Sequence, residues 1–186
     1  MTENESKPPR RIPWGAVLSL VGTVILTVGL VLIPFDASRF GNASYGALFI
    51  ITLLTNATVI LPAPGIAAVM QFAKTLNPLL VGVVAGIAAG LGESTGWLMG
   101  RSSRDLTQLD KTATGRRVVS WVQRRGTLTV FVLAAIPLPV IDLAGLAAGA
   151  MGMPWWRYVG ACMLGKTVRF TLVAYLVQYA KLRYLR

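Results

Sequence analysis

Residues 45–72 read YGALFIITLLTNATVILPAPGIAAVMQF, and this stretch decides the fold. The segment is long and apolar enough to cross a bilayer, but Pro62, Pro64 and Gly65 lie past its middle. Proline removes a backbone donor and clashes with the preceding turn, so two prolines around one residue end a helix. Irregular backbone at membrane depth is tolerated only where protein or water covers it. The pattern predicts a re-entrant hairpin with its tip at LPAPG and both ends on one side of the membrane.

The bulk composition is that of a membrane protein. The chain has 186 residues, of which 54% are hydrophobic and 13% charged, and its mean hydropathy is +0.62. A soluble domain carries about 25% charged residues. The net charge is +11, but most of the positive residues lie in tails and loops. This distribution favours a topology signal over a nucleic-acid footprint, so we expect no nucleic-acid partner.

The residue types speak against catalysis. The chain has no histidine and one cysteine, Cys162, which lies in an apolar segment. These counts exclude His-based zinc sites, Ser-His triads and an internal disulfide. We expect Cys162 to be an inert buried thiol. Because the sequence shows no nucleophile–base pair and no metal cluster, we expect no enzyme activity, no metal and no cofactor.

The chain divides into tails, spans and loops. Residues 1–13 are polar and predict a cytoplasmic tail, and residues 14–34 are a mostly apolar stretch about 20 residues long, enough for one span. A signal peptide is the alternative for 14–34, but no convincing small-x-small cleavage site follows. Residues 78–100 and 155–179 predict two further membrane helices, and 180–186 a basic tail.

Glycine ladders mark the predicted helix 78–100. The glycines fall into two sets: Gly82, Gly86 and Gly90, and Gly92, Gly96 and Gly100. Four-residue spacing places each set on one helix face, where bare backbone lets another helix approach closely. Glycine is common in membrane helices in general, but six in register favour close packing.

Residues 101–126 predict a basic cytoplasmic loop. Its positive residues are Arg101, Arg104, Lys111, Arg116, Arg117, Arg124 and Arg125. Within the loop, Val118, Trp121 and Val122 follow an i, i+3, i+4 pattern, which predicts a short amphipathic surface helix. This helix either touches anionic headgroups or serves only as a positive-inside anchor.

A second interrupted stretch, 127–150, contains Pro137, Pro139 and Asp142. If the amino-terminal tail and the basic loop both face the cytoplasm, an even number of crossings separates them, so 45–72 must re-enter. For 127–150 the arguments divide. A crossing would place the basic carboxyl terminus inside, but an acid at the bilayer centre costs about 2.5–3.5 kcal/mol.

Internal similarity favours a second re-entrant hairpin. In each half a Pro-x-Pro motif precedes a small-residue limb, a turn and a helix, which carries Gly92-Glu93 in one half and Gly165-Lys166 in the other. The predicted fold is therefore all-α: a polytopic integral membrane protein with an inverted repeat of two re-entrant helical hairpins, each followed by a transmembrane helix. Paired interrupted segments point to a transporter-type site at the midplane.

Charged residues at membrane depth are the candidate substrate or proton site. They are Glu93, Asp142, Lys166 and Arg169. In the functional interpretation, the acids bind or relay protons and the bases hold an anionic headgroup. In the structural interpretation, the same residues form two ion pairs that join the repeats. The hairpin tips add helix ends with unsatisfied backbone groups. The predicted tip residues are Pro62, Pro64, Gly65, Pro137 and Pro139.

Three stretches together resemble the DedA family, which shares the VTT domain of SNARE-associated Golgi membrane proteins. They are LPAPG, LNPLLVGVVAGIAAGLGESTGWLMGR and FVLAAIPLPVIDLAGLAAGAMGMPWWRYVGACMLG, and the resemblance covers residues 47–175. It implies two opposed re-entrant hairpins packed on membrane helices, and transport or scrambling of lipids between leaflets. Bacterial relatives are linked to recycling of the phosphorylated polyprenyl carrier and to proton-motive force.

The chain departs from the family pattern at charged positions. The family often has an acid directly after the first Pro-x-Pro-Gly, where this chain has Ile66. It often has arginines three residues before and a few after the second proline, where this chain has Ala134 and Val140 to Ile141. The four charged candidates are therefore this chain's own and do not come from the resemblance.

The expected function is a membrane transporter, flippase or scramblase that moves lipid or lipid-phosphate, with or without proton coupling. The expected partners are membrane lipids, including anionic or polyprenyl-phosphate headgroups; formation of a homo-oligomer stays open. The expected location is the bacterial inner membrane with the amino terminus in the cytoplasm. The alternative is a non-transporting scaffold that binds partner helices on its glycine faces.

Overall fold

The computed structural model describes residues 21–22, 25, 41, 43–57, 63–103, 109, 111–136 and 140–184. These residues form helices and turns, and they include no strand. The predicted all-helical class is confirmed. The predicted tail 1–13 and nearly all of the predicted span 14–34 lie outside the described residues, as do Pro62, Pro137 and Pro139.

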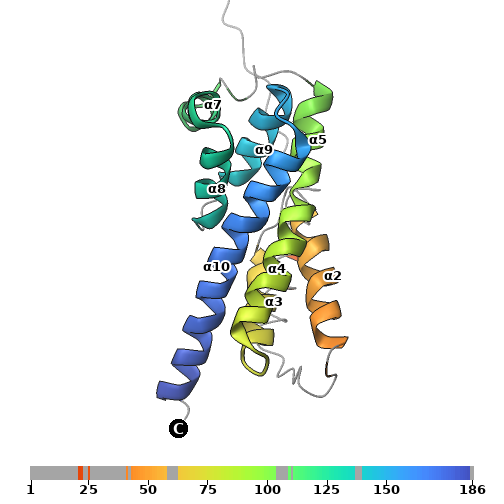
Figure 1. Cartoon of the computed structure of the whole chain (residues 1–186), viewed down its shortest axis with the longest axis vertical. Helices are drawn as coiled ribbons and strands as arrows, with labels where there is room; N and C mark the ends of the chain where they lie inside the picture. The colour runs from red at the N-terminus through yellow and green to blue at the C-terminus, as the bar shows by residue number, and fades with distance from the viewer. Residues whose placement is uncertain are drawn as a thin grey trace, which may run out of the picture.

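Two long apolar helices form the axis of the molecule (Figure 1). The first consists of α4 (Pro78–Gly92) and α5 (Ser94–Ser103) with Glu93 between them, and the second is α10 (Trp155–Tyr184). Each is long and apolar enough to cross a membrane, and each extends a few residues past the predicted ends at 100 and 179. Asn77 caps α4, because its side chain accepts the N–H groups of Leu79 and Leu80.

The first glycine ladder brings α4 and α10 into backbone contact. Gly82, Gly86 and Gly90 face Thr171, Thr167 and Met163 of α10, respectively. A Cβ atom on Gly86 would lie 2.4 Å from the Thr167 Cα atom, so no larger residue fits without separating the helices. The matching steps of four residues on both helices show that α4 and α10 run antiparallel.

The second ladder serves two other helices. Gly92 faces the backbone of α2 (Ala43–Ala57), whereas Gly100 faces Leu146 of α9 (Ile141–Ala150). Gly149 of α9 in turn lies against the Trp97 backbone. The predicted close packing is confirmed at Gly92 and Gly100, and both ladders are used within the chain itself.

Each end of the molecule holds one helix pair. At one end, α2 and α3 (Ala63–Ala73) pack against α4. At the other end, α8 (Thr127–Ala135) packs against α10, and α9 packs against α5. In Figure 1 the first helix of each pair runs from one end of the molecule toward its middle, and the second helix runs back to the same end. A separate apolar core forms around each pair.

The carboxyl-terminal end of α10 lies beside the turn that joins α3 to α4. Lys181 Nζ donates a hydrogen bond to the Lys74 carbonyl at 3.0 Å, and Gln178 Nε2 donates to the Leu76 carbonyl at 2.9 Å. Figure 1 places α7 (Ala113–Arg125) at the opposite end. The two groups of basic residues therefore lie at opposite ends of the molecule.

The amphipathic helix predicted in the basic loop is present as α7. It buries Val118, Val119 and Val122, whereas Trp121 is 49% exposed. Because α7 packs on both α8 and α9, its buried face is centred on the three valines and leaves Trp121 at the edge.

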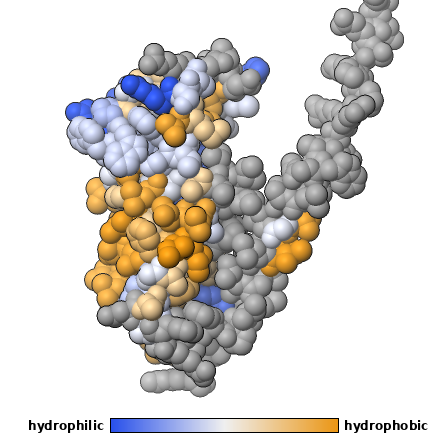
Figure 2. Space-filling model, turned by 90° about the vertical axis from the view of Figure 1, so that its right-hand side faces the viewer, coloured by the Kyte–Doolittle hydropathy of each residue, from blue (hydrophilic) through white to orange (hydrophobic). Residues whose placement is uncertain are grey.

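The surface is apolar where a soluble protein would be polar. Along α10, large hydrophobic side chains are exposed at steps of about one helical turn. They are Leu164, Val168, Leu172, Tyr175, Leu176, Tyr179 and Leu182. Figure 2 shows hydrophilic residues gathered at one end of the molecule, beside a broad band of hydrophobic residues. Exposed apolar area of this extent is typical of a lipid-facing surface.

Candidate functional site

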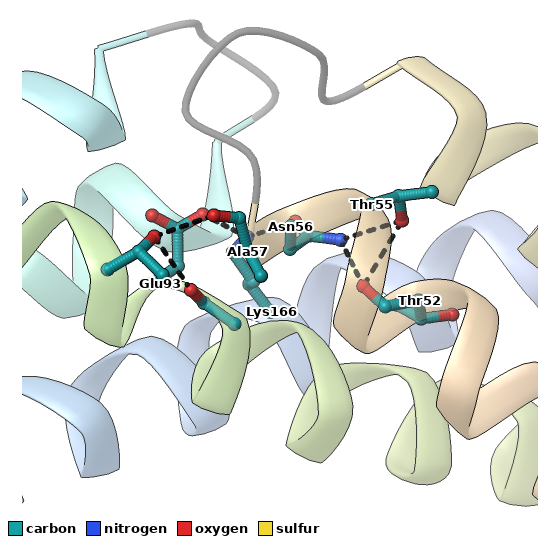
Figure 3. Close-up of polar contacts among 8 residues, drawn as sticks. Thr52, Thr55, Asn56, Ala57, Glu93 and Lys166 are labelled. Carbon is teal, nitrogen blue, oxygen red and sulfur yellow. Dashed lines mark hydrogen bonds and ion pairs between the residues drawn. The ribbon is translucent and has the colours of Figure 1, made fainter.

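The centre of the molecule holds a buried ion pair. Glu93 lies between α4 and α5, and Lys166 lies near the middle of α10; they are 4% and 2% exposed. Glu93 Oε1 accepts a hydrogen bond from Lys166 Nζ (Figure 3). The structure therefore brings together two of the four charged residues that the sequence singled out.

The end of α2 supplies a third member of this cluster. Asn56 Oδ1 accepts a hydrogen bond from Lys166 Nζ at 2.5 Å, while Asn56 Nδ2 donates to the Thr52 carbonyl at 2.8 Å. Figure 3 shows the Asn56 side chain between the ion pair and the last turns of α2. Asn56 is not among the site residues that the sequence predicts. The available signal was the polar run Thr52, Thr55, Asn56 inside an otherwise apolar segment.

Two further contacts hold the end of α2 in place. Thr95 Oγ1 donates a hydrogen bond to the Ala57 carbonyl at 2.9 Å, which satisfies one of the terminal carbonyls of α2. Gly65, near the start of α3, has room for no larger residue without crowding, because a Cβ there would lie 3.0 Å from Thr55 Oγ1 and Asn56 Nδ2. The polar end of α2 is thus enclosed by α3 and α5.

The second half has a matching contact without the polar groups. Gly165 lies against the end of α8, where a Cβ atom would be 2.5 Å from the Phe131 carbonyl oxygen and 3.0 Å from the Ala135 nitrogen. Gly92 makes the same kind of contact with the end of α2. In each half, therefore, a glycine allows close approach of the end of a helix, α2 in the first half and α8 in the second. The residue that follows this glycine is one partner of the ion pair.

The other two predicted charges lie beside the cluster. Asp142 is in the first turn of α9 and is half-buried, and its charge acts on Glu93 and Lys166. Arg169 lies one turn after Lys166, with its Cζ atom 5.7 Å from the Phe170 ring centroid. Arg169 Nε is buried and has no hydrogen-bond partner among the described residues. Neither residue makes a direct ion pair in the described part of the chain, so only one of the two predicted pairs is observed.

The predicted tip residues are described only in part. Pro64 belongs to the first turn of α3, and Gly65 is buried against the end of α2. Pro62, Pro137 and Pro139 lie outside the described residues. The helix ends on either side of them, namely Ala57 and Ala63, and Ala135 and Ile141, are described.

The cluster balances most of its charge within itself. A buried ion pair adds little net stability, because desolvation offsets most of the attraction. Lys166 is paired with Glu93, whereas Arg169 Nε has no hydrogen-bond partner within the described part of the chain. Two acids and two bases keep the neighbourhood close to neutral. The described residues contain no group of three His, Cys, Asp or Glu side chains that could hold a metal. Cys162 is fully buried, as predicted.

An apolar exterior, buried charges and two candidate spans define a helical membrane protein. The family model described as "VTT domain" matches residues 42–179. The chain therefore belongs to the VTT domain family, and the resemblance inferred from the proline motifs is confirmed.

Several curated proteins are similar to parts of the chain. Vacuole membrane protein KMS1 of Arabidopsis thaliana is 30% identical over 119 residues, which are 60% of this chain and 28% of that protein. Human vacuole membrane protein 1 is 34% identical over 67 residues, 36% of this chain and 16% of that protein. An uncharacterized protein of Haemophilus influenzae is 28% identical over 115 residues, 59% of each chain. The chain thus spans less than a third of KMS1. No solved structure matches.

Proposed function

We propose that this protein moves lipids or lipid phosphates between the two leaflets of a membrane, without covalent chemistry. The observation that carries the proposal is the buried cluster of Glu93, Lys166 and Asn56, placed where helix pairs from both ends of the molecule meet. A structural ion pair needs no such convergence of helix ends. A headgroup-binding site does, because helix ends supply the free backbone groups that bind polar ligands.

We further propose that α2–α3 and α8–α9 are re-entrant hairpins of an inverted repeat. At 1.5 Å per residue, the 15 residues of α2 reach about 22 Å and the 10 residues of α9 about 15 Å. The hydrocarbon core is about 30 Å thick, so neither helix crosses it. The contact between Lys181 and Lys74 supports the same topology, because it puts the carboxyl end of α10 on the side where α3 ends.

We propose that the protein lies in a bacterial inner membrane, with the amino-terminal tail and the basic helix α7 on the cytoplasmic side and the carboxyl terminus on the outer side. The basic residues of the carboxyl terminus then lie on the side that the positive-inside rule disfavours. The hydrogen bonds from Gln178 and Lys181 to the α3–α4 turn offer a reason, since they hold that end of α10 against the first helix pair.

Transport is tested by reconstitution. The purified protein is placed in vesicles with a labelled phospholipid or a labelled polyprenyl phosphate, and leaflet exchange is followed by quenching from outside. We expect exchange in the wild type and at least a tenfold loss in the double variant Glu93→Gln/Lys166→Met. Arg183→Met, which removes an exposed basic residue from the same helix, is the matched control and should retain exchange.

Absence of exchange with both lipids would contradict the proposal. Full exchange by a folded Glu93→Gln/Lys166→Met variant would show that the cluster is structural. The scaffold alternative predicts a stable protein without exchange; its premise of free glycine faces is weakened, since described helices of the same chain cover Gly82, Gly86, Gly90, Gly92 and Gly100.

Topology is tested by cysteine labelling with an impermeant maleimide. Cys162 is buried and gives little background. Single cysteines replace exposed Ala43, Lys74, Arg117 and Lys181. We expect positions 43, 74 and 181 to react from one side and position 117 from the other. Reaction of positions 43 and 74 from opposite sides would overturn the re-entrant hairpin.

A further inference from the structure

An apolar groove of about 380 Å³ runs between α7 and α8 on the outside of the molecule. One wall is the face of α8 from Leu128 to Ile136, and the other is made by Trp121 and Arg125 near the end of α7. Its lining is mostly apolar, and Arg125 is the one charged residue among the lining residues. The groove is separate from the ion-pair cluster, which lies on the inner side of α10.

The groove is a preformed feature of the backbone. Gly126 joins the two helices with a φ of +45°, a conformation that glycine adopts without strain. Thr129 Oγ1 donates a hydrogen bond to the Trp121 carbonyl at 2.8 Å and ties the start of α8 to the last turns of α7. Val118 and Val122 anchor the other face of α7 in the core. The angle between the two walls is therefore set by contacts beneath the groove.

The two ends of the groove differ in polarity. At the α7 end, Arg125 and the half-exposed Trp121 lie together, which is the pairing of basic and aromatic residues found at membrane interfaces. From there Leu128, Val132 and Ile136 follow at steps of four residues, and each is at least 41% exposed. Helix α7 carries four arginines and no acidic residue, so its field favours an anion.

The apolar end of the groove reaches the level of the candidate site. Ile136 follows directly on the end of α8, and that end touches Gly165, the neighbour of Lys166. From Leu128 to Ile136 the helix rises about 12 Å, at 1.5 Å per residue. A long apolar chain lying in the groove would therefore run from the membrane interface toward the depth of Lys166.

We propose that this groove binds one acyl chain of an anionic glycerophospholipid, whose phosphate pairs with Arg125. The proposal rests on the lipid-moving function above and identifies where its substrate docks. An arginine fork matches phosphate oxygens, Trp121 lies at the glycerol level, and α8 packs along the chain. A free phosphate would use only the Arg125 end and leave the apolar wall exposed, so a lipid fits the whole groove.

The test measures lipid proximity at equilibrium and requires no transport. A fluorophore is attached to Val132→Cys in nanodiscs of phosphatidylcholine, and spin-labelled phosphatidylglycerol or spin-labelled phosphatidylcholine is added as the quencher. We expect half-quenching by the anionic lipid at about fivefold lower mole fraction, the effect of one basic residue at a membrane surface. Arg125→Gln should abolish this preference, whereas Arg124→Gln, which removes the adjacent arginine, should retain it. Leu172→Cys, exposed on α10 away from the groove, should show no preference.

Equal quenching by both lipids at Val132→Cys would overturn the proposal, as would a preference that survives Arg125→Gln. Quenching that falls as the protein-to-lipid ratio rises would place a second copy of the chain in the groove and also overturn it. Inorganic phosphate that displaces the anionic lipid at millimolar concentration would show a simple anion site instead. Glu93→Gln/Lys166→Met should keep the preference while losing leaflet exchange, so failure of the groove and failure of the transport proposal are distinguishable.

Discussion

The two halves of the molecule place their helices alike but fill the central positions differently. In the first half, α2 ends with polar groups, and Asn56 reaches Lys166 directly. In the second half, the last six residues of α8 are VFVLAA, and the contact with α10 is made by backbone and small apolar atoms at Gly165. Glu93 follows the glycine of the first half, and Lys166 follows that of the second.

This difference shows which contacts hold the halves together. The ion pair joins a residue of each half, so it requires the two long helices to be assembled. The first helix pair is tied to the ion pair by hydrogen bonds, whereas the end of the second is held there by packing alone among the described residues. We infer that α2 is the fixed side of the site. Moving the end of α8 away from α10 should cost less free energy than moving the end of α2 away from the ion pair.

The largest expected effect comes from breaking the ion pair on one side. Lys166→Met leaves Glu93 and Asn56 buried without their cationic partner, and such a change costs about 3–5 kcal/mol. Glu93→Gln/Lys166→Met removes both charges and should recover most of that loss. Unfolding in mixed detergent–SDS micelles measures both, with Arg183→Met as the control. A single variant no less stable than the double would mean that the two halves are not joined by this pair.

Overpacking at the two matched glycines should have the next largest effect. Gly92→Ala places a Cβ under 3.0 Å from the end of α2, and Gly165→Ala places one under 3.0 Å from the end of α8. Overpacking of this kind costs about 1–3 kcal/mol. Gly160→Ala is the control, because nothing lies within 4 Å of its Cβ position. It should be neutral or slightly stabilising, since alanine is the better helix former.

The same pair of variants sharpens the comparison of the halves. Gly92→Ala should also weaken the hydrogen bond from Lys166 to Asn56, because it displaces the end of α2. Gly165→Ala displaces α8 and should leave that bond intact. In thermal unfolding, Asn56→Ala should then be nearly additive with Gly165→Ala and clearly non-additive with Gly92→Ala. The opposite pattern would refute the assignment of α2 as the fixed side.

The smallest expected effect concerns the hydrogen bond from Thr95 to the Ala57 carbonyl at the end of α2. Among the described residues, the end of α8 has no matching bond. Thr95→Val leaves the Ala57 carbonyl without its side-chain donor and should cost about 0.5–1.5 kcal/mol. Thr95→Ser keeps the hydroxyl and should retain most of the stability in the same SDS titration. Equal losses in Thr95→Val and Thr95→Ser would indicate that the methyl group, and not the hydrogen bond, supports the end of α2.

Much of the helix order could be predicted, because apolar length, proline and glycine act locally. The two long helices, the interruption between α2 and α3 and the close-packing role of the ladders all follow from residue types and spacing. Glu93 and Lys166 could be selected because charges within apolar segments are costly and need partners. Asn56 was not selected, since its role depends on a residue 110 positions away.

Trp121 illustrates a different limit. Its spacing from Val118 fits a buried position, and helical periodicity alone cannot choose between it and Val119. The choice depends on how α7 packs against α8 and α9, which in turn depends on the turn at Gly126. The groove next to Trp121 has the same origin and left no recognisable pattern in the sequence.

The sequence by itself determined an all-helical membrane protein, with charges in apolar segments that need partners and with glycines that allow close helix packing. It could do so because hydropathy and backbone sterics are properties of single residues and short segments. Only the tertiary structure decided which acid meets which base, that Asn56 joins them, and that the carboxyl end of α10 lies beside the α3–α4 turn. These outcomes depend on contacts between segments far apart in the chain, and such contacts are set by how whole helices pack.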